Sequence, residues 1–219
     1  MEKSDNSNHR WDRLWTNKIT NFYPNLPAAH YFDNFVRRKV YFNAIDKLLG
    51  EISFKNKEII ELGSGTGSNS LHLAKTHCAK KITLVDFSEK ALARVEVDRF
   101  PCLINKIKED IFEISSERKY DFVHSTGLIE HFLDEDRFLA VKKHVDFVRD
   151  DGMVMIWVPI FSKAFRPIKK INKILGIKEQ PFTKDELRFI FKESGLEIIN
   201  EGESLLGALF GVLGRKNNS

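Results

Sequence analysis

Short apolar runs and helix-like apolar patterns alternate along the chain from about residue 57 onward. The apolar runs predict strands at about 58–62, 81–86, 102–107, 120–124 and 153–158. Apolar positions at helical spacing predict helices at about 67–76, 88–100, 134–148 and 184–194. Two more strands are expected at about 196–200 and 207–214. This alternation predicts an α/β fold with a mostly parallel sheet.

The segment before this alternation has a helical pattern of its own. Trp11, Leu14 and Trp15 fit one helical face, and residues 33–49 carry apolar side chains at helical spacing. We therefore divide the chain into an N-terminal helical extension over residues 1–54 and a core over residues 55–219.

The composition is that of one globular domain with a sizeable core: 219 residues, 42% hydrophobic and 30% charged. No apolar run approaches the ~18–20 residues of a membrane span, and the polar N-terminus lacks the centre of a signal peptide. Cys78 and Cys102 are expected to be reduced. These features predict a cytoplasmic protein. The net charge of +4 is too mild to call for nucleic acid by itself.

The most informative stretch is the sequence at residues 59–70, IIELGSGTGSNS. A buried strand is followed by glycines at Gly63, Gly65 and Gly67 and then by a helix start. Glycines there allow positive φ and a close approach of the backbone to a ligand. The dinucleotide fingerprint G-x-G-x-x-G would place its third glycine at Ser68, so the spacing disfavours a nicotinamide-dependent oxidoreductase.

The sequence E-L-G-S-G-T-G at residues 61–67 resembles motif I of the class I S-adenosylmethionine (SAM) dependent methyltransferases. The order of strands and helices over about 55–214 is also similar to the core of that family. The resemblance implies a three-layer, Rossmann-like sheet of seven strands with the last one antiparallel. It also implies SAM as cofactor and S-adenosylhomocysteine (SAH) as product. In that family an N-terminal extension often covers the SAM site as a lid; a packing helix without ligand contact is the alternative here.

The resemblance also assigns residues at the carboxyl ends of the first two strands. The backbone at Gly63, Ser64, Gly65 and Gly67 would lie close to the methionine part of SAM. Glu61 would help to fix this turn and the SAM ammonium, often through water. Two further residues follow the second strand, Asp86 and Phe87. A carboxylate at position 86 can accept hydrogen bonds from both ribose hydroxyls, and the ring at position 87 would lie against the adenine; a plain helix cap is the alternative for the acid.

At the third strand, Asp110 would accept a hydrogen bond from the adenine amino group, and the Ile111 N–H would face a ring nitrogen. A loop carboxylate without ligand contact is the alternative. At the fourth strand, the backbone carbonyls near Ser125 and Thr126 would meet the SAM ammonium. Ligands of open α/β sheets bind at the carboxyl ends of the strands, so agreement among four such ends carries the cofactor prediction.

Methyl transfer is an in-line displacement in which the protein mostly aligns the reactants, and a base is needed only when the nucleophile must lose a proton. His131 is the candidate base, because it follows the fourth strand and an imidazole titrates near neutral pH. A packing role is the alternative. A metal-binding subgroup carries Glu-x-x-Glu-His at this place; Gly127 stands where the first acid would be, so we predict no metal.

Residues 160–182 are expected to form an inserted segment that recognises the acceptor. Six basic side chains occur before the first acid, Glu179, and apolar residues are interleaved with them at helical spacing. This basic amphipathic pattern favours an acidic or phosphorylated acceptor, or peripheral contact with an anionic membrane. A solvated helix that covers the sheet edge is the alternative.

The predicted function is transfer of the SAM methyl group to an oxygen or nitrogen of a small or medium organic acceptor. The alternatives are an RNA or protein methyltransferase, which the basic segment favours, and a non-catalytic SAM-binding protein. The fourth strand ends in Ser-Thr-Gly-Leu. It thus lacks the Asn/Asp-Pro-Pro-Tyr/Phe tetrapeptide of many base and glutamine N-methylating enzymes. No RNA-binding module is visible, and no stable nucleic-acid partner is predicted.

Overall fold

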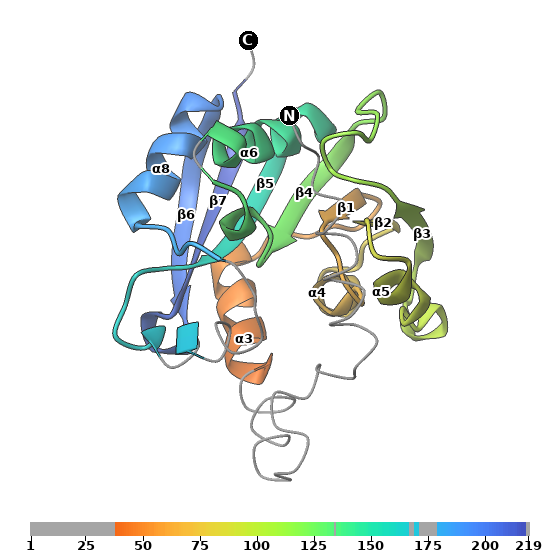
Figure 1. Ribbon diagram of the computed structural model, residues 1–219. Coiled ribbons are helices and arrows are strands. Elements are labelled where there is room, and N and C mark those ends of the chain that lie inside the picture. Colours follow the sequence, from red (N-terminus) through yellow and green to blue (C-terminus); the bar gives the residue numbers. More distant parts are fainter. Residues whose placement is uncertain (1–37, 134, 167–168, 171–178, 218–219) are drawn as a thin grey trace, which may run out of the picture.

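The computed structural model describes residues 38–133, 135–166, 169–170 and 179–217. Its centre is a seven-stranded sheet in the order β3-β2-β1-β4-β5-β7-β6, in which β7 alone runs antiparallel to the rest. The strands are β1 (Glu58–Leu62), β2 (Lys81–Asp86), β3 (Leu103–Lys108), β4 (Tyr120–Thr126), β5 (Val148–Pro159), β6 (Leu196–Ser204) and β7 (Leu209–Lys216). The predicted α/β fold with seven strands and an antiparallel last strand is confirmed (Figure 1).

Helices cover both faces of the sheet and give the domain three layers (Figure 1). The helices of one face are α3 (Arg38–Leu49), α4 (Ser68–His77) and α5 (Glu89–Ala93), and those of the other are α6 (Glu135–Phe147) and α8 (Lys184–Glu193). Side chains of β1 alternate between the two faces of the sheet: Ile59 packs in the core beneath α3, α4 and α5, and Ile60 packs in the core beneath α6 and α8. The short 3-10 helices are η2 (Val97–Arg99), η3 (Ile129–His131) and η4 (Leu205–Gly207).

Two elements differ from their predicted bounds. The helix expected to reach Phe100 ends at Ala93, and η2 follows it, because apolar spacing marks a buried face without fixing where helical hydrogen bonding stops. The strand expected at about 153–158 begins earlier, because β5 starts at Val148. Asp151 has the positive φ of a turn, 59°, but the chain continues as a strand and the pairing between β4 and β5 shifts there, so the extra residues form a bulge.

Parts of the sequence predictions lie outside the described residues. These are the extension before residue 38, which includes Trp11 and Trp15, and positions 167–168 and 171–178 of the basic segment. Within the described ranges, no helix is long and apolar enough to cross a membrane.

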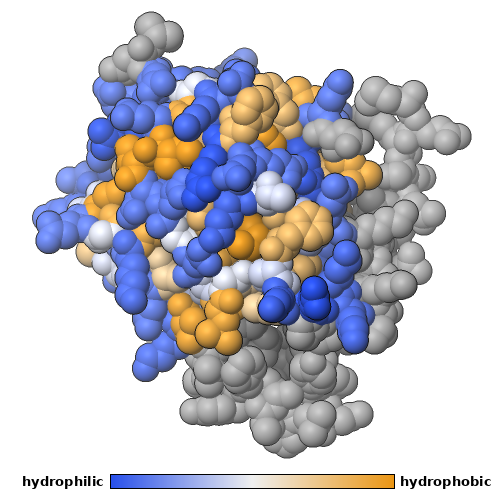
Figure 2. Space-filling view, turned by 90° about the vertical axis from the view of Figure 1, so that its left-hand side faces the viewer, coloured by the Kyte–Doolittle hydropathy of each residue, from blue (hydrophilic) through white to orange (hydrophobic). Residues whose placement is uncertain are grey.

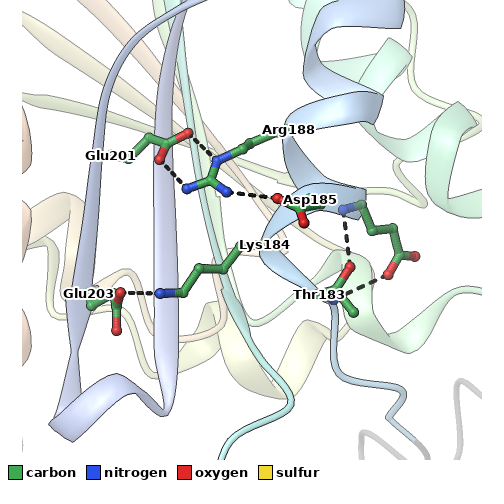
Figure 3. Close-up of polar contacts among 7 residues, drawn as sticks. Thr183, Lys184, Asp185, Arg188, Glu201 and Glu203 are labelled. Atoms are coloured by element: carbon green, nitrogen blue, oxygen red, sulfur yellow. Dashed lines mark hydrogen bonds and ion pairs between the residues drawn. The ribbon is translucent and has the colours of Figure 1, made fainter.

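Helix α8 is fixed to strand β6 by a charged cluster (Figure 3). The guanidinium of Arg188 donates to both carboxylate oxygens of Glu201, at 2.7 and 2.6 Å, and to Asp185 at 2.8 Å. The helix begins with a capping box: Thr183 Oγ1 accepts from the Glu186 N–H at 3.1 Å, and the Glu186 carboxylate accepts from the Thr183 N–H at 3.3 Å. These contacts secure the edge of the sheet farthest from β3.

Trp157 is fully buried where β5 meets β7, and Gly211 makes room for its ring. A Cβ at position 211 would overlap the indole, which the surrounding core holds in place. Gly211→Ala is therefore expected to lower the free energy of unfolding by about 1–3 kcal/mol, as overpacked cores do, in urea denaturation followed by circular dichroism.

The matched control is Gly202→Ala on β6, directly opposite Gly211. A Cβ at position 202 would contact Trp157 at 3.5 Å, an ordinary packing distance. Equal destabilisation by the two substitutions would contradict the steric argument.

Candidate active site

A glycine loop joins β1 to α4 at the carboxyl edge of the sheet. Gly63, Gly65 and Gly67 all have positive φ, 63°, 55° and 69°. A Cβ on Gly63 would lie 2.7 Å from Leu128, and one on Gly67 would lie 2.8 Å from Leu84, so side chains would clash as well as strain the backbone. The loop thus presents bare main chain, and α4 begins after it without a side-chain cap on its N–H groups.

Asp86, the last residue of β2, is bound to this loop. Its Oδ2 accepts a hydrogen bond from the Gly65 N–H at 2.8 Å, and its Oδ1 accepts one from the Ser88 N–H at 2.8 Å. The strand-end acid predicted as the ribose ligand therefore lies at the glycine loop. Phe87, the predicted adenine neighbour, follows it and is half-buried.

Glu61 lies buried beneath the loop in a polar chain. It accepts hydrogen bonds from Asn69 Nδ2 at 3.2 Å and from Ser70 Oγ at 2.6 Å. Ser70 Oγ is also 3.2 Å from His124 Nε2. Because the Ser70 hydroxyl proton goes to Glu61, the His124 ring donates from Nε2, while its Nδ1 has no hydrogen-bond partner in the described part of the chain. Burial raises the pKa of Glu61 to about 7 and lowers the pKa of His124 to about 3.

The third strand places the predicted adenine contacts beside Asp86. The Glu109 N–H donates to the Asp86 carbonyl at 3.2 Å, which holds the end of β3 against the end of β2. Asp110 follows and is exposed; its Oδ1 accepts from the Phe112 N–H at 2.9 Å, as in the alternative of a turn carboxylate. Ile111 is buried in the core. The end of β3 thus brings Asp110 and Ile111 to the edge of the candidate site, while the Asp110 carboxylate also accepts a hydrogen bond within its own turn.

The side chains at the end of β4 point to opposite faces of the sheet. Ser125 Oγ lies 2.9 Å from His144 Nε2 of α6, and Thr126 Oγ1 lies 2.7 Å from the Tyr41 hydroxyl of α3. Only the backbone carbonyls of these two residues were predicted to face SAM, and these contacts by the hydroxyls are compatible with that role. The sequence prediction missed Tyr41 and His144, since both partners are distant along the chain.

His131 ends η3, directly after β4. Gly127, with φ 68°, makes the turn into η3. The side chain of His131 is 16% exposed, and its Nε2 lies 3.9 Å from Oε1 of the buried Glu130. Burial raises the pKa of Glu130 to about 8, and its Oε2 has no hydrogen-bond partner among the described residues. The candidate base is therefore accessible and lies beside a carboxyl that is mostly neutral at pH 7.

Arg137 is a second residue that sequence reasoning missed. It is only 3% exposed and holds three segments together. Its Nε donates to the Phe132 carbonyl at 3.1 Å, and its terminal nitrogens donate to the Gln180 carbonyl and to Glu186. Its guanidinium lies 3.9 Å from the centre of the Phe182 ring. A signal was present: this arginine precedes Ala140, Val141, His144 and Val145 at helical spacing, on the buried face of α6.

The observed geometry fits the predicted cofactor. Ser64, within the glycine loop, is buried, and its Oγ has no hydrogen-bond partner in the described part of the chain. An unpaired buried hydroxyl beside bare main chain and a strand-end carboxylate suits a polar ligand at this edge. The described residues contain no group of three or more histidine, cysteine or acidic side chains placed to hold a metal ion. The expectation that no metal binds stays a prediction.

Comparison with known proteins assigns the family. A family model described as a methyltransferase domain matches residues 32–201. The chain therefore belongs to the methyltransferase-domain family, and its predicted membership of the class I SAM-dependent methyltransferases is confirmed.

The relatives differ in what their names say they modify. Malonyl-[acyl-carrier protein] O-methyltransferase 1 of Ilyobacter polytropus is 25% identical over 183 residues, which are 83% of this chain and 65% of that protein. Ribosomal RNA small subunit methyltransferase G of Borrelia garinii subsp. bavariensis is 25% identical over 138 residues, 61% of this chain and 64% of that protein. The chain thus spans slightly less than two thirds of the length of these curated relatives.

Solved structures share the fold at low sequence identity. The magnesium protoporphyrin IX methyltransferase of Synechocystis PCC 6803 with bound SAH has a TM-score of 0.74 and 13% identity, covering 96% of this chain and 98% of its own. The N-methyltransferase NodS of Bradyrhizobium japonicum WM9 in complex with SAH has a TM-score of 0.70 and 16% identity, covering 98% and 100%. These likenesses agree with the fold of the described residues.

The buried ionisable groups around the site predict how stability depends on pH. Burial raises the pKa values of Glu61 and Glu130 to about 7 and 8. Their contribution to the free energy of unfolding is therefore full below their ordinary pKa of 4.5 and is lost as the pH rises through 7 to 8. Burial also lowers the pKa of His124 to about 3 and that of His144 to about 4. Their contribution is present above the ordinary value of 6.5 and is lost as the pH falls through 4 to 3.

Between pH 4.5 and 6.5 the glutamates lower the stability as the pH rises, and the histidines raise it, so the two effects offset one another. Of these four residues, only the glutamates change the stability above pH 6.5. The free energy of unfolding is therefore expected to fall between about pH 6.5 and 8, by roughly 2 kcal/mol for Glu130 alone. Urea unfolding across this range measures it. Glu130→Gln should flatten the slope, whereas the exposed Glu117→Gln should leave it unchanged. A slope that survives Glu130→Gln in full would contradict the assignment.

Proposed function

We propose that this chain transfers the methyl group of SAM to an oxygen or nitrogen of a small or medium organic acceptor by direct in-line displacement. The observation that carries the proposal is the bond between the Asp86 carboxylate and the Gly65 N–H, in a loop of three left-handed glycines. It joins a ribose-binding acid to bare main chain at the edge where α/β sheets bind nucleotides.

In this proposal the Asp86 carboxylate accepts hydrogen bonds from both ribose hydroxyls. Phe87 and Asp110 lie along the adenine, with the Ile111 N–H at a ring nitrogen. Glu61, already surrounded by hydrogen-bond donors, supplies negative charge beneath the loop when it is ionised. The backbone carbonyls of Ser125 and Thr126 accept from the ammonium of the cofactor.

Bound SAM supplies a methyl group that is already activated by a sulfonium leaving group. The protein must therefore align the acceptor, exclude water and remove a proton where the acceptor carries one. We assign proton removal to His131, which is partly exposed at the end of η3. The neighbouring Glu130 carboxyl is mostly neutral at pH 7.

The malonyl group named for one relative supports a small acceptor, and the names of the similar proteins differ in the atom methylated. The relative from Ilyobacter is an O-methyltransferase, whereas NodS is an N-methyltransferase. The described cations of the segment after β5, Lys163, Arg166, Lys169 and Lys170, are exposed. They support an acceptor that carries acidic or phosphate groups.

Calorimetric titration tests the cofactor assignment. SAM and SAH are expected to bind to a single site, and NAD is expected not to bind. Binding of NAD without SAM or SAH would overturn the proposal. Incubation with methyl-labelled SAM and a low-molecular-weight cell extract then separates an enzyme from a non-catalytic binder, because only the enzyme releases SAH in step with label in a small molecule.

The similarity to ribosomal RNA small subunit methyltransferase G favours RNA as a second candidate acceptor. The same labelled SAM should be offered to ribosomal subunits that lack methylation. Label in RNA with none in small molecules would replace the first proposal by the second.

A further inference from the structure

The turn η4 exposes an apolar side chain on strained backbone. The φ angles of Leu205, Leu206 and Gly207 are 53°, 57° and 79°, so three successive residues are left-handed. Leu206 is 98% exposed and thus gains nothing from burial within the described part of the chain. Leucine is rarely found in this conformation. Strain kept at a fully exposed apolar residue points to a partner that the described residues do not supply.

Two other elements reach the same end of the molecule. Val40 and Ala44 of α3 line a groove together with Leu205 and Leu206. The Ile160 N–H donates to the carbonyl of Ala208 at 3.1 Å, which places the segment after β5 beside η4. Figure 1 shows η4, this segment and the first turn of α3 at the end toward which the parallel strands point.

Exposed apolar and cationic side chains from these elements form what we call the η4 surface. Its apolar members are 44%, 57% and 98% exposed, and its cations are all exposed. Figure 2 shows the molecule from the side of α8 and η4, where hydrophobic patches lie among strongly hydrophilic side chains. The η4 surface comprises Val40, Phe161, Leu206, Arg38, Lys39, Lys163, Arg166, Lys169 and Lys170.

The acids near this surface do not cancel its charge. Glu203 lines the same groove, but its carboxylate pairs with Lys184 of α8. The sequence from Phe161 to Lys178 contains no acidic residue. The η4 surface therefore combines a protruding leucine with a net positive border.

We propose that the η4 surface binds an anionic lipid bilayer. Cations at its border complement acidic headgroups, and Leu206 enters the boundary between headgroups and acyl chains. A protruding leucine suits a soft apolar phase, since no preformed pocket is needed to receive it. Bilayer binding would place the carboxyl edge of the sheet, with its candidate active site, against the membrane. This inference does not depend on methyl transfer, because binding is measured without SAM.

Vesicle flotation of the full chain tests the proposal. Vesicles of phosphatidylcholine and phosphatidylglycerol in equal amounts should carry the protein, and vesicles of phosphatidylcholine alone should carry much less. Added salt should weaken binding, because it screens exposed charges beyond about 10 Å at 0.1 M.

Matched variants separate the η4 surface from general stickiness. Leu206→Asn is expected to weaken binding at least about tenfold without loss of stability, because asparagine tolerates the left-handed region. Its control is Leu103→Asn, where the leucine is 69% exposed on the edge strand β3. Lys163→Gln combined with Arg166→Gln should also weaken binding at least about tenfold, a loss of roughly two surface cations. The control pair is Lys75→Gln with Lys192→Gln, two exposed lysines late in α4 and α8.

The proposal is overturned by any of three results. The protein does not float with anionic vesicles; the control variants weaken binding as much as the η4 variants; or the η4 variants bind vesicles normally but lose affinity for an acidic protein such as an acyl carrier protein. The last result would assign the same surface to a protein partner.

Discussion

Asp86→Ala is expected to lower the affinity for SAH at least about 10²-fold in calorimetric titration. In the proposed complex, the substitution removes two hydrogen bonds that the ribose hydroxyls would donate to the carboxylate, each contributing roughly 1.5–3 kcal/mol. It also leaves the Gly65 and Ser88 N–H groups without the oxygens that now accept from them. The glycine loop should therefore lose both its ligand contact and its anchor on β2.

Two further variants make this result interpretable. Asp98→Ala removes an exposed acid from η2 and should leave SAH affinity unchanged. Asp86→Asn keeps the shape of the side chain and one acceptor oxygen, so it reports on binding even if the alanine variant fails to fold. If the folded Asp86→Asn and Asp86→Ala proteins bind SAH with wild-type affinity, the assignment of Asp86 to the ribose is wrong.

His131→Ala is expected to reduce methyl transfer about 10²-fold, the low end of general acid–base effects, while SAH affinity stays unchanged. The reason is the position of the imidazole, which is partly exposed at the end of η3, the turn after β4, where the acceptor is expected. Release of SAH from labelled SAM in the presence of the acceptor extract measures the turnover.

Glu130→Gln is the companion substitution. Because the pKa of Glu130 is raised to about 8, its carboxyl is mostly neutral at pH 7, and an amide of the same shape should preserve most activity. A loss smaller than about fivefold in His131→Ala would return that residue to a packing role. Equal losses in both variants would indicate that the Glu130–His131 turn matters through its shape.

The sequence revealed the elements whose signals are local. The glycine spacing at 63–67 and the strand-end acid Asp86 are each readable from a few neighbouring residues, and the structure brings them into contact. The predicted ends of helices and strands were less accurate where the same local sequence fits either a turn or an irregular strand. Asp151 has the positive φ of a turn, but strand β5 continues through it as a bulge.

The contacts that the sequence did not reveal all join distant segments. Tyr41 meets Thr126, and Arg137 meets Gln180 and Glu186, across separations that no local pattern encodes. In such cases the sequence shows only that a polar residue occupies a buried helix face, without naming its partner. The roles of the site residues toward SAM likewise stay predictions.

The buried Arg137 has a practical consequence for exchanging acceptor preference between relatives. Its side chain holds Gln180, Phe182 and Glu186 as one unit with the turn that ends at Phe132. A chimera that joins a foreign loop at residue 182 would divide this unit and leave the buried guanidinium of Arg137 without its partners. A junction placed after Glu186 lies outside the unit. The chimera must then also carry the arginine that pairs with the exchanged segment, either the host's own or the donor's equivalent.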